Sequence, residues 1–176
     1  QHVLVDTANG PAVLDLFANV VVAPAAEDRT VLPAGWRDAA TLLGVRVSSA
    51  DGESSLEIVT RGINENGWTP VSRAEVGEVE GQVSPGAAHA SPDGSRILLI
   101  YPTSTAPNAG WAALVDTNTG QRVAFTGADA DDVPAWDGCA PVWQGDQPLT
   151  ASAGLRRPGD QATVLKFSGR MNLGCV

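Results

Sequence analysis

The chain of 176 residues is 43% hydrophobic and 18% charged, which fits one folded domain with a sizeable core and excludes a largely disordered protein. Its 20 acidic and 11 basic residues give a net charge of −9, which argues against nucleic acid or an anionic membrane surface as a partner. The longest strongly apolar runs, Val20–Ala23 and Ile97–Ile100, are far shorter than the ~20 residues of a transmembrane helix. Short apolar runs among 19 glycines and 12 prolines predict an all-β fold of brief strands and tight turns.

The first predicted element is a hairpin at residues 4–13, "LVDTANGPAV". The same pattern returns 110 residues later at residues 114–123, "LVDTNTGQRV", with Leu, Val, Asp, Thr, Gly and Val shared in register. Asp, Asn and Gly between two apolar segments are typical of a tight hairpin turn. The self-match predicts a chain that is built from repeated units.

A second pattern, an aspartate in a turn followed by an apolar run, also recurs along the chain. Its three copies carry Asp38 in "WRDAATLLGVRV", Asp93 in "SPDGSRILLIYP" and Asp146 in "VWQGDQPLTAS". Another apolar segment follows each copy, so the predicted unit is turn, strand, loop, strand, hairpin and strand, with room for a fourth strand in each linker. The units assigned in this way are the end of one unit at residues 1–20 and further units at residues 34–75, 88–127 and 140–176.

The segment "ASPDGSRILLI" followed by "WAALVDTNTGQRV" resembles the WD40-like or TolB-type β-propeller repeat. The resemblance is good over residues 88–126, partial over residues 3–16 and poor in the two remaining units. It implies one partial β-propeller domain of about three and a half four-stranded blades. A β-sandwich is the alternative, because short strands with regular turns suit that fold as well. The chain has one lysine against ten arginines, and this composition resembles that of proteins encoded by GC-rich actinobacterial genomes.

Half a blade at residues 1–20 would leave an apolar face and a strand edge open, which implies a partner. The expected partner is the N-terminal half of the same propeller or a second protein chain, including another copy of this one. We therefore expect a non-enzymatic binding or scaffold module, the C-terminal half of a propeller that acts through protein–protein contacts. The alternative is a propeller subunit of an extracytoplasmic hydrolase whose catalytic groups lie in the missing N-terminal part.

Motifs for catalysis or cofactor binding are absent from the sequence. "GESSL" at residues 52–56 lacks the second glycine of a serine-hydrolase elbow, and the chain has no phosphate loop and no dinucleotide fingerprint. The two histidines, His2 and His89, stand at no metal-binding spacing from a cysteine, a carboxylate pair or each other. We accordingly predict no catalytic residue, no cofactor and no metal ligand.

Two other features are weighed as binding sites. Four aspartates between Asp129 and Asp137 offer hard oxygen ligands for calcium, but their spacing is not that of an EF-hand loop, and a solvated loop is the favoured interpretation. The five tryptophans are interpreted as packing residues rather than sugar-stacking platforms, with Trp136 in the acidic loop as the exception. The other four are Trp36, Trp68, Trp111 and Trp143.

The two cysteines, Cys139 and Cys175, span the last predicted unit and are predicted to form a disulfide. The bridge would close a loop of about 35 residues and stabilise the fold by ~3–4 kcal/mol. Two buried free thiols in a cytosolic protein are the alternative. Gln1 at the start and Met171 as the single methionine indicate that an upstream segment was removed, and a signal peptide, a pro-segment and another domain are the alternatives for that segment. Together with the predicted disulfide, this leads us to expect an exported, extracytoplasmic chain.

Overall fold

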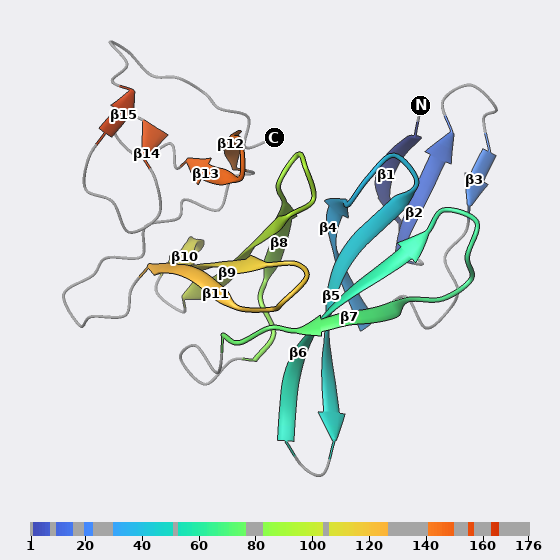
Figure 1. Ribbon diagram of the computed structural model, residues 1–176, viewed down its shortest axis with the longest axis horizontal. Coiled ribbons are helices and arrows are strands. Elements are labelled where there is room, and N and C mark those ends of the chain that lie inside the picture. Colours follow the sequence, from blue (N-terminus) through green and yellow to red (C-terminus); the bar gives the residue numbers. More distant parts are fainter. Residues whose placement is uncertain are drawn as a thin grey trace.

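The computed structural model describes residues 2–7, 10–15, 20–22, 30–50, 53–76, 83–103, 106–126, 141–149, 155–156 and 163–165. The regular elements in these ranges are all β-strands (Figure 1), which confirms the predicted all-β class. Within the same ranges, no helix is long and apolar enough to cross a membrane.

Two four-stranded antiparallel sheets form the centre of the described structure. In both sheets each strand pairs with its neighbours in the chain, in the order β4-β5-β6-β7 for sheet I and β8-β9-β10-β11 for sheet II. The three-stranded sheet β1-β2-β3 precedes them, and the hairpins β12-β13 and β14-β15 follow. The strands are β1 (His2–Thr7), β2 (Gly10–Asp15), β3 (Val20–Val22), β4 (Val31–Trp36), β5 (Thr41–Ala50), β6 (Glu53–Gly62), β7 (Thr69–Arg73), β8 (Ala87–Ala90), β9 (Arg96–Thr103), β10 (Ala106–Asp116), β11 (Arg122–Thr126), β12 (Val142–Gln144), β13 (Gln147–Leu149), β14 (Leu155–Arg156) and β15 (Thr163–Leu165).

The three aspartates of the predicted turns each lie between the first two strands of a unit. Asp38 lies between β4 and β5, Asp93 between β8 and β9, and Asp146 between β12 and β13. The side chains of the first two aspartates accept a hydrogen bond from the backbone N–H two residues later, at 2.9 Å for Asp38 and 3.1 Å for Asp93. This local bond is the reason that aspartate favours such turns.

The two copies of the sequence self-match occupy the same kind of position in the structure. The first copy is the β1-β2 hairpin, in which Asp6 pairs with Pro11 and Thr7 with Gly10. The second copy is the β10-β11 hairpin, in which the backbone N–H of Asp116 donates to the carbonyl of Gln121 at 2.9 Å. Both turns therefore connect an Asp to the residue five positions later, and Val115 pairs with Arg122 as Val5 pairs with Ala12. Beyond this pair the registers differ, because a register shift pairs Leu114 with Ala124.

The core lies on both faces of sheet II. None of the five residues Ile97–Tyr101 of β9 is more than 4% exposed, although neighbouring residues in a strand point to opposite faces. Ile97, Leu99 and Tyr101 belong to a cluster that includes Leu43 and Ile58 of sheet I. On the other face, Leu98, Ile100, Ala112 and Leu114 form a second cluster, against which Trp143 of β12 packs.

Sheets I and II approach each other through their first strands, β4 and β8. A Cβ atom placed on Gly35 of β4 would lie 3.2 Å from the Cβ of Ala90 in β8. The hydrophobic cluster shared by sheets I and II therefore accompanies a close backbone contact between their first strands, β4 and β8.

The β5-β6 hairpin extends beyond its neighbours as a two-stranded arm (Figure 1). The two strands pair along their whole length, from Thr41 with Gly62 to Ala50 with Glu53. By contrast, β4 pairs with β5 only as far as Arg46, and β7 with β6 only as far as Glu57. Val47, in the arm, is 37% exposed.

Candidate functional site

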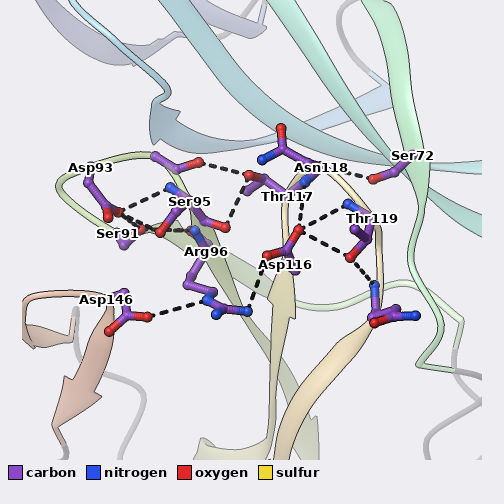
Figure 2. A network of polar contacts seen from close by, with 12 residues as sticks. Ser72, Ser91, Asp93, Ser95, Arg96, Asp116, Thr117, Asn118, Thr119 and Asp146 are labelled. Atoms are coloured by element: carbon purple, nitrogen blue, oxygen red, sulfur yellow. Dashed lines mark hydrogen bonds and ion pairs between the residues drawn. The ribbon is translucent and has the colours of Figure 1, made fainter.

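A network of polar contacts joins the turns at one end of the sheets (Figure 2). It includes the β8-β9 turn at residues 91–95, the β10-β11 turn at residues 116–121, the end of β7 and Asp146 of the β12-β13 hairpin. The network is the largest set of polar side-chain contacts described for this chain, and we take it as the candidate site.

Asp93 organises the β8-β9 turn. Its Oδ1 atom accepts hydrogen bonds from the Ser91 hydroxyl at 2.6 Å, the Ser95 hydroxyl at 2.8 Å and the Ser95 backbone N–H at 3.1 Å. The Ser91 hydroxyl donor, followed by the Ser95 donors, lowers the pKa of Asp93 below its usual value. The carboxylate is thus held in its charged form by its own turn.

Asp116 organises the β10-β11 turn in the same way. Its Oδ1 accepts from the backbone N–H groups of Asn118 and Thr119, both at 3.0 Å, and from the Thr119 hydroxyl at 3.1 Å. The Thr119 backbone donor is the largest cause of the lowered pKa of Asp116, and the charge of Arg96 contributes as well. A carboxylate with a lowered pKa is a weak base at neutral pH, so neither aspartate is tuned for general-base catalysis.

Among the described residues, three hydrogen bonds connect the turns of sheet II to sheet I. The Ser72 hydroxyl of β7 donates to the Thr117 carbonyl at 2.9 Å, and the Glu75 backbone N–H donates to the Gly120 carbonyl at 2.8 Å. From the first turn of sheet I, Arg37 Nη2 donates to the Asn118 side-chain oxygen at 2.7 Å.

Arg96 connects sheet II to the unit that follows it. Its Nη1 lies 3.3 Å from Asp116 Oδ2, and its Nε lies 3.5 Å from Asp146 Oδ2 (Figure 2). The Nε atom is buried and has no partner at hydrogen-bond geometry, so its contact with Asp146 is an ion pair without a well-formed hydrogen bond. In the two contacts between units that involve an arginine, the earlier unit supplies the arginine and the later unit supplies the oxygen.

A second surface feature is an open groove of about 320 Å³ between the β6 strand of the arm and the end of β7. Residues of β6, of the end of β7 and of the segment after it line the groove, and they are Ser54, Ser55, Leu56, Arg73, Ala74, Glu75 and Val83. Its one basic and one acidic side chain are both exposed, so the groove carries no concentrated charge.

Both histidines and four of the five tryptophans belong to the described part of the chain. His2 begins β1, and His89 lies in β8, where burial lowers its pKa. Trp111 packs against the cluster between sheets I and II, and Trp143 against the cluster on the far face of sheet II, which confirms the packing role for these two. Trp36 lies in β4, and the Trp68 side chain is half-buried beside Gly44.

Three predicted features lie outside the described residues. They are the disulfide between Cys139 and Cys175, the acidic loop Asp129–Asp137 and its Trp136. Among the residues that the structure describes, no group of three or more His, Cys, Asp or Glu side chains could hold a metal ion.

Sequence reasoning missed the arginines that join the units and the length of the arm. Arg37 and Asn118 are 81 residues apart, and no local pattern links them. A signal for the arm was present, because Asp51-Gly52 is a strong two-residue hairpin turn, and it stands between the paired residues Ala50 and Glu53.

Tyr101 leads to a prediction about alkaline pH. Burial raises its pKa from 10.0 to about 12, so the phenol ionises in the unfolded chain before it does so in the folded one. The contribution of the neutral Tyr101 phenol to the free energy of unfolding is therefore fully present below pH 10 and is lost as the pH rises toward 12. At pH ~11 the free energy of unfolding of the wild type should be lower by about 1 kcal/mol for this reason, and Tyr101→Phe should not show this loss.

The measurement is chemical unfolding of both proteins at pH ~9 and pH ~11. Tyr101 is the only tyrosine in the chain, so its ionisation can also be followed directly by ultraviolet absorbance. Near neutral pH the Phe variant should be as stable as the wild type, because the buried hydroxyl has no hydrogen-bond partner. Equal losses in both proteins at high pH would contradict the argument.

Comparison of the chain with models of protein families, with curated proteins and with solved structures gives no match, so no family is assigned to it.

Proposed function

We propose that the chain is a non-enzymatic scaffold and binding module in which sheets I and II are blades of a β-propeller. The observation that carries this proposal is the burial of sheet II on both faces, with Leu98 and Leu99 of one strand each 0% exposed. In a two-sheet sandwich, each sheet buries one face and presents the other to solvent. In a propeller, each blade lies between two neighbouring blades.

The contact between first strands also supports a propeller. Blades radiate from a common axis, so their innermost strands lie closest together. Strands β4 and β8 are the first strands of their meanders, and they are the strands through which sheets I and II approach each other. In parallel sandwich sheets, several strand pairs would be at similar separation.

The polar network supports binding rather than catalysis. Its two central carboxylates, Asp93 and Asp116, are occupied by donors within their own turns, and its arginines connect neighbouring units. We propose that the partner supplies further blades, and that the chain acts outside the cytoplasm with Cys139 and Cys175 joined.

The test of the proposal is the state of association of the isolated chain. A partial propeller should associate in solution, so light scattering over a concentration series should give a mass above the 18.1 kDa of one chain. Such an interface should bury at least ~1,200 Å² and be apolar at its centre, because it replaces packing between blades. A monomer at all concentrations, with cooperative unfolding, would rule out the partial-propeller proposal.

A further inference from the structure

The outer edge of β6 becomes open at the point where β7 leaves it. The backbone N–H of Ala74 donates to the Leu56 carbonyl at 2.8 Å, just beyond the last register pair of β6 and β7. The next N–H along the chain, that of Glu75, donates instead to the Gly120 carbonyl of sheet II at 2.8 Å. From this point to the tip of the arm, no described strand lies beside the outer edge of β6, and the groove between β6 and the end of β7 follows instead.

The alternation of an antiparallel ladder shows which backbone groups this edge offers. Because the Leu56 carbonyl points toward Ala74 and away from β5, the backbone N–H and C=O of Ser54 point the same way. Ser49 of β5, which pairs with Ser54, then directs its own backbone groups to the opposite edge of the arm. Ser54 therefore offers one donor and one acceptor to an added strand. Residues 53–56 contain no proline and no lysine, which are residues that commonly protect strand edges.

Two exposed charges on this edge make no ion pair among the residues that the structure describes. They are Glu53 of β6 and Arg73 of β7. Glu57, the register partner of Arg73, is bound to Arg46 instead, at 2.9 Å. Glu53 shares a face with Glu57 but lies four residues nearer the tip, which corresponds to about 13 Å along the strand. Glu53 and Arg73 of one chain are therefore too far apart to form an ion pair.

A second copy of the arm complements both features at once. If two β6 strands pair antiparallel about a two-fold axis at Ser54, each Ser54 N–H donates to the Ser54 carbonyl of the other copy. The same register places Glu53 of one copy opposite Ser55 of the other. That position is two residues, or about 7 Å, from Arg73 along the edge and lies on the same face. The long side chains of Glu53 and Arg73 can then meet, twice in each dimer.

From these observations we infer that the β6 edge at Glu53–Leu56 is a pairing site for the same edge of a second copy of this chain. The arm extends beyond the neighbouring strands (Figure 1), so a second arm can reach its edge. The overlap is short, and an interface of this size is typical of weak, concentration-dependent association. The inference does not rest on the proposed propeller, because it uses only the arm and the end of β7.

The experiment compares Ser54→Pro with Ser49→Pro in sedimentation equilibrium over a concentration series. Proline has no backbone N–H and is tolerated where that N–H would face away from the neighbouring strand, so both variants keep the ladder between β5 and β6. The hydroxyls of the two serines lie 3.2 Å apart, so both variants lose the same side-chain hydrogen bond. We expect Ser54→Pro to weaken dimerisation about tenfold or more, because two backbone hydrogen bonds are lost, and Ser49→Pro to leave it unchanged.

Charge reversal tests the inference at exposed side chains, where folding is not at risk. Glu53→Arg and Arg73→Glu should each weaken dimerisation by about threefold or more, because each places like charges side by side. The double variant should dimerise as the wild type does, since opposite charges again face each other across the axis. Higher salt should weaken dimerisation of the wild type.

The outcomes separate the arm from other modes of association. Weaker dimerisation of Ser54→Pro but not of Ser49→Pro, with rescue by the double charge reversal, supports the inference. Association that is equal in the wild type and both proline variants overturns it and leaves the association expected of a partial propeller in place. A wild type that is monomeric at every concentration overturns it as well, and the open edge would then be left to a strand of another protein.

Discussion

Leu98→Ala and Leu99→Ala will each lower the free energy of unfolding by about 2–5 kcal/mol, although the two side chains point to opposite faces of β9. Leu99 packs in the cluster between sheets I and II, and Leu98 in the cluster that Trp143 covers. Both side chains are 0% exposed, so each truncation removes buried apolar contacts and leaves a cavity. Unfolding in denaturant, followed by tryptophan fluorescence, gives the two values.

Val47→Ala in the arm is the control for this pair. Val47 is 37% exposed, so its truncation should change stability by no more than about 0.5 kcal/mol. If Leu98→Ala were as mild as this control, the far face of sheet II would be open to solvent. That result would remove the main support for a stack of blades and favour the sandwich.

Gly120→Ala is expected to lower the free energy of unfolding by about 3 kcal/mol or more, because two effects act at once. The φ of 75° is strained for any residue with a side chain. The added methyl group would also overlap the backbone carbonyl of Arg73, which cannot rotate away as a side chain could. The methyl group would therefore push sheet II away from sheet I, and a large fall in melting temperature measures the effect.

Two other glycines separate strain from overlap. Gly145 has a φ of 63° but no neighbour within 4 Å, so Gly145→Ala should cost only the conformational part, about 1–2 kcal/mol. Gly67 has neither feature, and Gly67→Ala should be close to neutral. If Gly120→Ala and Gly145→Ala were equally destabilised, the close approach of the β10-β11 turn to β7 would be refuted.

Local chemistry made much of the fold predictable from the sequence. The turn positions of Asp38 and Asp93 follow from bonds to a backbone N–H two residues away, and such bonds depend on adjacent residues. The match of "LVDTANG" with "LVDTNTG" likewise reports a hairpin whose geometry is set within a few residues. The apolar run at residues 97–100 predicted a strand, and it forms part of β9.

The features of the fold and of the candidate site that could not be predicted depend on residues that are far apart in the sequence. Which unit receives the Arg37 side chain depends on how two sheets stack, and nothing near Arg37 in sequence identifies Asn118. The pairing of β3 with β2 was missed because three valines, Val20–Val22, are too short a run to distinguish a strand from a loop. The contact of Arg96 with Asp146 needed the position of the next hairpin.

The meander order of sheets I and II has a consequence for folding and for the history of the chain. Every strand pair in these sheets joins neighbours in sequence, so each sheet can form by closing short loops, and only the stacking of sheets is non-local. We therefore expect each sheet to assemble early as a separate unit and the units to dock later. Because no strand of one sheet completes another, a whole unit can be duplicated or lost without changing the pairing of the rest, and a self-match at a step of 110 residues is the trace that such duplication leaves.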